Sequence, residues 1–142
     1  MTVTQTIKII NAGSDVGLEV YTSNLYELFS NSALAMFSLI TDTTGIKENI
    51  MQEISVKSSN LDGLIIAYLN ELIFMFDAYG FIPKRFDFID LTENSVKVKA
   101  YGDKFDSSKS EKRLLIKAAT YHDLFVKKIN SNKWRLKVIF DI

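Results

Sequence analysis

The sequence predicts an α+β fold in which two helices pack against a mostly antiparallel or mixed β-sheet. Two segments, residues 25–41 and 61–79, carry apolar residues at helical spacing. Most of the remaining chain alternates apolar and polar residues with period two, as half-buried strands do. The predicted order is two strands, helix, strand, helix and four strands. This is not the repeating strand–helix–strand order that builds parallel sheets.

The two predicted helices carry recognisable end signals. Asn24 is placed to cap the first helix, and Glu27 three residues later completes a capping box. Asn60 and Gly80 are the expected N-cap and C-cap of the second helix. The apolar residues of the second helix cover more than one face, so we expect it to be packed between layers.

The strands are predicted from alternation and from the turns that separate them. Three single strands are expected at residues 6–10, 18–21 and 50–58. Two more lie around Phe86–Phe88 and Val96–Ala100, on either side of a turn at 92–94. The last two, 114–129 and 133–142, form a hairpin. The polar and charged segment 102–113 is predicted to be a loop.

The register of the last hairpin follows from matching apolar faces. A turn at residues 130–132 pairs Val126 with Leu136, Leu124 with Val138 and His122 with Phe140. In this register His122 is expected to be a buried, hydrogen-bonded histidine rather than a ligand or general base. Asp141 is expected on the opposite face, next to Tyr121.

Composition limits the possible functions. The 142 residues suit one domain, residues 1–142, and 47% hydrophobic with 24% charged residues exclude general disorder. The chain has no Cys and one His, which excludes disulfides, thiolate zinc sites and multi-histidine metal sites. The 17 Lys and Arg balance the 17 Asp and Glu, so global charge does not predict attachment to nucleic acid or anionic lipid.

No segment resembles a targeting or membrane-spanning sequence. The first residues lack the basic region and apolar run of a signal peptide. The longest apolar run, residues 64–76, is interrupted by Asn70 and Glu71 and is too short to span a bilayer. We therefore expect a soluble, cytoplasmic protein without a membrane partner.

The balanced net charge conceals an asymmetry along the chain. Residues 1–80 hold three Lys and nine Asp or Glu, a net charge of −6, whereas residues 81–142 hold fourteen Lys or Arg and eight Asp or Glu, a net charge of +6. The two halves could form separate patches that steer a charged partner, or could interleave so that the charges mix. Mixing is the favoured interpretation.

Carboxylates near the two ends of the chain form the candidate site. Asp141 and the main-chain carboxylate of Ile142 are adjacent and repel each other unless a cation intervenes. Lys117, beyond the end of the partner strand on the same face, could reach the terminal carboxylate. Asp15 lies between two predicted strands in segment 11–17, where an ordinary turn is the simpler explanation. Together the three carboxylates would suit Ca²⁺ or Mg²⁺.

Several segments, taken together and in order, resemble the archease family. They are SDVGLEVY at 14–21, NLYELFSNSALAMFSLITD at 24–42, LNELIFMFDAYGF at 69–81, YGDKFD at 101–106, KAATYHDL at 117–124 and WRLKVIFDI at 134–142. The resemblance implies an α+β domain and a metal site built from Asp15, Asp141 and Ile142, with Lys117 close to it. Family histidines are replaced here, at Ala12 and near Ser110.

Archeases are small cytosolic proteins that assist the RtcB-type tRNA-splicing ligase and are not enzymes themselves. The resemblance therefore implies an accessory protein that promotes guanylylation and turnover of that ligase and broadens its use of nucleoside triphosphates. The expected cofactor is Ca²⁺, with Mg²⁺ or Mn²⁺ as alternatives. The expected partner is the ligase, with tRNA contacted indirectly and no DNA.

Two other functions remain open at this point. An RNA-binding chaperone of tRNA processing would use the basic second half with Tyr101, Phe105 and Trp134, although no RNA-binding signature is present. A small hydrolase would use Asp15 and Asp141 as acid and base, which is weak evidence on its own.

Overall fold

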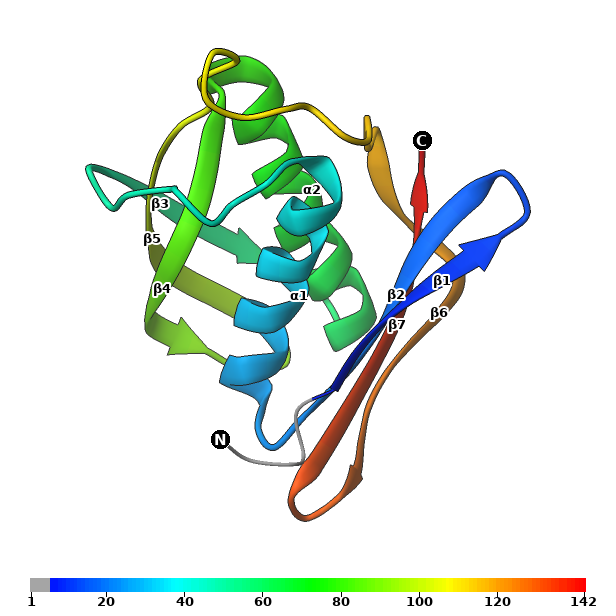
Figure 1. Cartoon of the computed structure of the whole chain (residues 1–142). Coiled ribbons are helices and arrows are strands. Elements are labelled where there is room, and N and C mark those ends of the chain that lie inside the picture. Colours follow the sequence, from blue (N-terminus) through cyan, green and yellow to red (C-terminus); the bar gives the residue numbers. More distant parts are fainter. Residues whose placement is uncertain (1–5) are drawn as a thin grey trace.

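Two antiparallel sheets enclose two helices in the computed structural model, which describes residues 6–142 (Figure 1). The elements in chain order are β1 (Thr6–Ala12), β2 (Asp15–Thr22), α1 (Leu25–Ile40), β3 (Ile50–Lys57), α2 (Leu61–Tyr79), β4 (Phe81–Leu91), β5 (Ser95–Lys104), β6 (Ala118–Asn130) and β7 (Lys133–Asp141). The predicted α+β class with antiparallel pairing is therefore confirmed.

The strands divide between two sheets, a feature that the sequence analysis did not predict. The order is β1-β2-β7-β6 in the four-stranded sheet and β3-β5-β4 in the three-stranded sheet. The helices lie between them, since α1 contacts β2 and β4, and α2 contacts β6 and β3 (Figure 1). Because β2 pairs with β7, the four-stranded sheet places the first hairpin of the chain beside the last.

Both helices begin where their N-cap residues predict, and α2 also ends at its predicted C-cap. The Asn24 side chain accepts a hydrogen bond from the Glu27 backbone N–H at 2.9 Å and donates one to the Glu27 carboxylate at 2.8 Å. At the start of α2 the Asn60 side chain accepts from the Gly63 N–H at 2.8 Å. Gly80 ends α2 with φ of 70°, a conformation that glycine adopts without steric cost.

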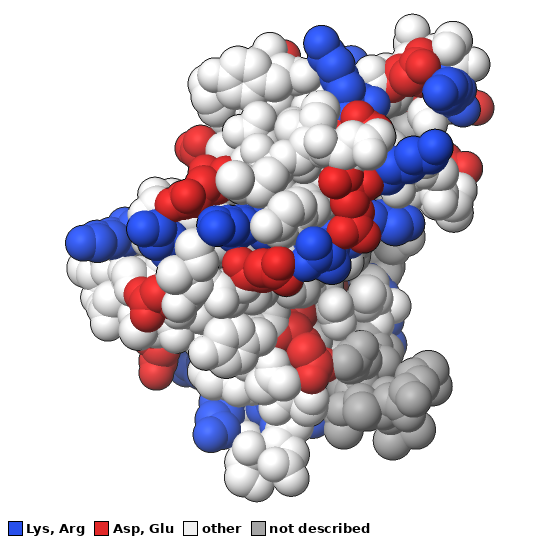
Figure 2. Space-filling view, turned by 90° about the vertical axis from the view of Figure 1, so that its left-hand side faces the viewer, with Lys and Arg blue, Asp and Glu red and all other residues white. Residues whose placement is uncertain are grey.

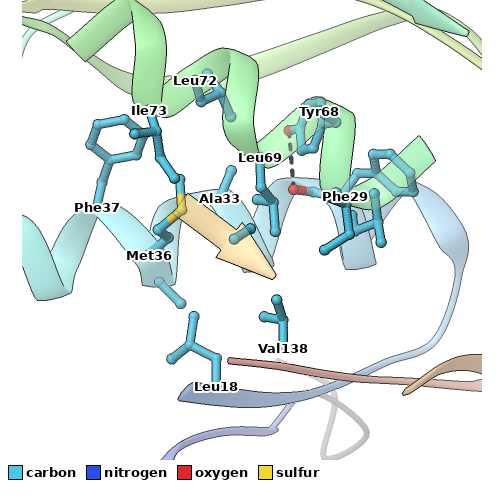
Figure 3. Packing of buried hydrophobic residues seen from close by; sticks show 14 of the residues in the cluster. Leu18, Phe29, Ala33, Met36, Phe37, Tyr68, Leu69, Leu72, Ile73 and Val138 are labelled. Carbon is cyan, nitrogen blue, oxygen red and sulfur yellow. Dashed lines mark hydrogen bonds between the residues drawn. The ribbon is translucent and has the colours of Figure 1, made fainter. Parts of the chain in front are cut away.

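The core lies where α2 is covered on several sides, as its apolar surface predicted. The Tyr68 side chain is fully buried, and its hydroxyl donates a hydrogen bond to the Phe29 carbonyl of α1 at 3.1 Å (Figure 3). Leu18 of β2 and Val138 of β7 point from the four-stranded sheet toward the helices. This packing holds β2 and β7 side by side against one helical layer.

The β6–β7 hairpin follows the predicted register only near its turn. Val126 faces Leu136, as predicted. Farther from the turn, residues 121–124 form a bulge that lies against a single position of β7. Within it, Asp123 has φ of 51°, in the left-handed region that few residues other than glycine adopt. The bulge changes the register of every pair beyond it.

The predictions that depended on an uninterrupted register are wrong. Leu124 does not face Val138, His122 does not face Phe140, and Asp141 faces Ala118 rather than Tyr121. The His122 side chain is 70% exposed, with Nε2 3.4 Å from a carboxylate oxygen of Asp123. His122 is therefore a surface residue of the bulge and not the buried histidine that was predicted.

Charges from the two halves of the chain mix, which agrees with the favoured interpretation. Glu19 and Arg135 lie 3.4 Å apart across the four-stranded sheet, and Glu53 and Lys97 lie 3.6 Å apart across the three-stranded sheet. Figure 2 shows Lys and Arg interspersed with Asp and Glu on the side where the three-stranded sheet lies. Neither helix within residues 6–142 combines the length and apolar content needed to cross a membrane.

Candidate metal site

The β1–β2 turn is shorter than the sequence suggested. Only Gly13 and Ser14 separate the strands, and Ala12 pairs with Asp15 directly across the turn. Gly13 has φ of 67°, which suits a tight hairpin connection. Asp15 is therefore the first residue of a strand rather than part of a longer loop, and the pairing of β2 fixes its position.

Asp15 and Asp141 occupy corresponding positions at one end of the four-stranded sheet. Val16 pairs with Phe140, and the next residues outward along the two strands are Asp15 and Asp141. Val16 and Phe140 face the core. Since successive side chains of a strand alternate between faces, the two aspartates belong to the outer face. Asp141 is exposed and Asp15 is partly exposed.

Gly17 accounts for the close approach of β2 and β7 beside the two aspartates. It faces Ile139. A Cβ at this position would lie 2.6 Å from Ile139 Cδ1 and 2.7 Å from the Val138 carbonyl oxygen. Because real Cβ atoms do not come this close, any residue larger than glycine would force the two strands to shift at this point. The glycine of the Asp-Val-Gly segment therefore serves the strand pairing next to Asp15.

Lys117 and Ile142 lie at the same end of the sheet. The Lys117 backbone N–H donates to the Asp141 carbonyl at 2.7 Å, and Ala118 pairs with Asp141. Ile142 directly follows β7, and Figure 1 shows this chain end beside the hairpin of β1 and β2. The structure thus brings together, at the level of the backbone, all four positions that the sequence analysis selected.

The two aspartates have no internal partner within residues 6–142. Neither carboxylate forms a hydrogen bond or ion pair with a described residue, and the Lys117 ammonium forms no ion pair there. No group of three or more His, Cys, Asp and Glu side chains in that range is arranged to hold a metal ion. Any bound cation would need ligands besides Asp15 and Asp141, such as a main-chain carboxylate, water or a partner molecule.

The donor set nevertheless suits a hard cation. Two carboxylates just beyond the last paired position of β2 and β7 offer oxygen ligands only, which is the preference of Ca²⁺ and Mg²⁺. Their exposure leaves room for water molecules, which Mg²⁺ in particular retains. Metal binding by Asp15, Asp141 and Ile142 stays a prediction.

A well-defined hollow of the described surface lies away from these aspartates. It has a volume of about 660 Å³ and is lined by residues of two loops, within 42–49 and 103–110. Its three carboxylates all accept hydrogen bonds: those from Thr44 lower the pKa of Asp42, those from Ser108 lower the pKa of Asp106, and Asp103 accepts one from the Asn49 side chain of the facing loop. These contacts indicate loop-stabilising roles.

The aromatic residues suggested for RNA binding do not form one surface. Tyr101 belongs to the three-stranded sheet. The Arg85 guanidinium lies over its ring, 4.3 Å from the ring centre. Phe105 packs edge-on against Phe76. Trp134 belongs to the other sheet and packs against the core. This set therefore cannot form a continuous stacking platform.

Comparison with known proteins identifies similar chains. The sequence model of the archease protein family matches residues 8–142. A protein named archease from Pyrococcus abyssi is 32% identical over 91% of this chain and 93% of its own length. A protein of the same name from Sulfolobus acidocaldarius is 34% identical over 91% of this chain and 93% of its own length.

Two solved structures share the fold. A solution structure of a Methanobacterium thermoautotrophicum protein has a TM-score of 0.80 at 24% identity and covers 96% of this chain and 98% of its own. A Thermotoga maritima crystal structure, described as an archease and possible chaperone, has a TM-score of 0.65 at 20% identity. It covers 95% of this chain and 96% of its own. At these identities the two structures establish similarity of fold.

Proposed function

We propose a function for this chain from one premise: it belongs to the archease family. The proposed role is that of an accessory protein, not an enzyme, which activates an RtcB-type tRNA-splicing ligase. It would promote guanylylation of the ligase, support repeated turnover and broaden the nucleoside triphosphates that the ligase accepts. Transfer RNA would then be contacted through the ligase.

The observation that carries this proposal is the position of Asp15 and Asp141. They are the next residues beyond a paired position of β2 and β7, on the outer face, and their carboxylates have no partner within residues 6–142. Two unneutralised carboxylates on neighbouring strands at the same end of a sheet repel each other. A shared cation would remove this repulsion, which supports their assignment as ligands together with the main-chain carboxylate of Ile142.

Ca²⁺ is the proposed cation, with Mg²⁺ and Mn²⁺ as alternatives, because the donors are all oxygen. Such a cation would supply positive charge close to phosphate groups. The aspartates would bind and orient it at an exposed end of the sheet, where a partner's pocket can reach it. Lys117, held beside Asp141 by a backbone hydrogen bond, would add a second positive charge to the same corner.

A guanylylation assay with the cognate ligase and radiolabelled GTP tests the proposal. The wild-type chain is expected to increase the rate of guanylylation. Asp15→Asn and Asp141→Asn should each abolish the increase, since an amide keeps the size of the carboxylate and loses its charge. The matched control is Asp77→Asn. It removes an exposed carboxylate of α2, which lies far from both Asp15 and Asp141 in the sequence.

The possible outcomes separate the parts of the proposal. Full stimulation by both site variants would reject the acidic site while leaving ligase activation intact. No stimulation by the wild-type chain, with an active ligase in the same assay, would reject ligase activation itself. Loss of stimulation by Asp77→Asn as well would show a general effect of lost charge rather than a site.

A further inference from the structure

The outer face of the four-stranded sheet carries aligned rows of side chains from all four strands. One row follows Tyr21, Arg135 and Lys127, which face one another across β2, β7 and β6. The next row follows Lys8, Glu19, Lys137 and Phe125 from β1 to β6. Facing residues of antiparallel strands share a side of the sheet, so each row forms a continuous strip across it.

Cations and aromatic rings alternate in these rows. Lys133 Nζ lies 4.7 Å from the centre of the Tyr21 ring, and the Arg135 guanidinium lies 5.9 Å from the same centre. Arg135 is also 4.6 Å from the centre of the Phe125 ring, and Lys127 Nζ is 5.8 Å from it. The series Lys133, Tyr21, Arg135, Phe125 and Lys127 thus forms a ladder of three cations and two rings.

Positive charge is in excess on this face. The basic residues of the rows and of the adjoining β7 position are Lys8, Lys127, Lys133, Arg135 and Lys137. Glu19 is the acidic residue among them, and it is neutralised because it pairs with Arg135 at 3.4 Å and accepts a hydrogen bond from the Tyr21 hydroxyl at 2.7 Å. The opposite sheet, in contrast, shows mixed charges (Figure 2).

We propose that this face binds single-stranded nucleic acid. Rings and guanidinium groups offer surfaces on which unpaired bases stack, while the lysines beside them neutralise phosphates. A duplex hides its base faces, so the rings favour a single strand. An acidic protein would use the lysines but would not need rings between them, which makes it the less suitable occupant.

The acidic end of the same face limits where a bound nucleic-acid strand can lie. Asp15 and Asp141 are four residues along β2 and β7 from the row of Glu19 and Lys137, a distance of about 13 Å. Without a cation these carboxylates repel phosphates, so the footprint is confined to the rows with the cations and rings. The proposal stands independently of the proposed role toward the ligase.

The test measures binding of a labelled oligouridine of about twelve nucleotides to the full chain by fluorescence anisotropy, without ligase. Lys127→Glu with Lys133→Glu is expected to weaken binding at least tenfold. Loss of two phosphate contacts should also reduce the slope of log K against log salt by about 1.4. The matched control, Lys57→Glu with Lys84→Glu, makes the same charge change on the three-stranded sheet and should change affinity less than twofold.

A ring variant separates stacking from charge. Phe125→Leu keeps an apolar side chain and removes the ring, so it should weaken binding several-fold with an unchanged salt slope and an unchanged unfolding midpoint. Absence of salt-sensitive binding by the wild-type chain would overturn the proposal. So would equal losses in the two charge-reversal variants, or tighter binding of a duplex of the same length. If only ligase stimulation falls in Lys127→Glu with Lys133→Glu, the face docks a protein and the proposal is wrong.

Discussion

Gly17 of β2 faces Ile139 of β7 so closely that a Cβ on Gly17 would lie 2.6 Å from Ile139 Cδ1. The Val138 carbonyl oxygen would be 2.7 Å from the same Cβ, and this backbone atom cannot move without disturbing the sheet. The glycine therefore keeps β2 and β7 paired up to the positions before Asp15 and Asp141. Its contribution can be measured separately from that of the aspartates.

Gly17→Ala is expected to lower the free energy of unfolding by about 1–3 kcal/mol, the usual cost of forcing an extra carbon into a packed site. Urea unfolding measures this change. Gly45→Ala is the matched control, because a Cβ there meets no atom within 4 Å. An unchanged midpoint for Gly17→Ala would show that the strands separate easily at this end.

Tyr68→Phe is expected to lower the free energy of unfolding by about 1 kcal/mol. The variant loses the buried hydrogen bond to the Phe29 carbonyl but keeps the ring and its packing. Tyr79→Phe is a suitable control, since Tyr79 is 57% exposed. Thermal or urea unfolding of the two variants makes the comparison. If Tyr68→Phe and Tyr79→Phe are equally stable, the 3.1 Å hydrogen bond from Tyr68 to Phe29 makes no measurable contribution to the free energy of unfolding.

The helix ends were predictable from the sequence because capping is local. Asn24 and Asn60 reach backbone N–H groups three residues away, and Gly80 adopts its left-handed conformation within a single turn. Each signal can be read in a window of a few residues. The predicted and observed bounds of α2 agree at both ends for this reason.

The bulge at residues 121–124 could not be predicted from period-two alternation. The alternation can be continued through this part of β6 by assigning His122 to the apolar face, so the pattern does not reveal that four residues lie against one position of β7. The exposure of His122 follows from that local insertion. The division of the strands into two sheets likewise depends on packing against both sides of the helices.

The meeting of Asp15 and Asp141 required information beyond spacing. The residues are far apart in the sequence, and only the pairing of β2 with β7 brings them to corresponding positions. Family resemblance predicted this grouping, whereas the residues alone favoured an ordinary turn around Asp15. The ladder around Arg135 was missed because Tyr21 belongs to β2, which becomes a neighbour of β7 only in the folded sheet.

The contacts of Glu19 with Tyr21 and Arg135 predict a pH dependence of stability. The hydrogen bond from Tyr21, aided by Arg135, outweighs desolvation and lowers the pKa of Glu19 below its ordinary value of 4.5. A carboxyl group with a lowered pKa in the folded state contributes stability above its unfolded pKa. This contribution is lost as the pH falls through the folded pKa.

Wild type should therefore exceed Glu19→Gln in unfolding free energy at pH 7, and the difference should shrink as the pH falls below about 4.5. Urea unfolding at a series of pH values between 7 and 3 measures the difference. Glu93→Gln, at an exposed turn, controls for the loss of a carboxylate. A difference that is constant over this range would mean that Glu19 acts through packing rather than charge.

Cation binding by the acidic corner can be tested without the ligase. If Asp15, Asp141 and Ile142 hold Ca²⁺ in the folded state only, the ion stabilises that state by about 2.7 kcal/mol when its free concentration is about 100 times Kd. Thermal unfolding with increasing Ca²⁺ should then show a rising midpoint that EDTA reverses. Mg²⁺ and Mn²⁺ titrations under the same conditions identify the preferred ion.

Replacement of both aspartates, Asp15→Asn with Asp141→Asn, should remove the dependence on Ca²⁺. In metal-free buffer the double variant should be at least as stable as wild type, because two repelling carboxylates have been neutralised. This second result matters, since a general structural defect would lower stability in the absence of metal. The control variant Asp77→Asn should keep the dependence of the midpoint on Ca²⁺. If the midpoint of the double variant rises with Ca²⁺ as much as that of the control, the cation binds elsewhere on the molecule.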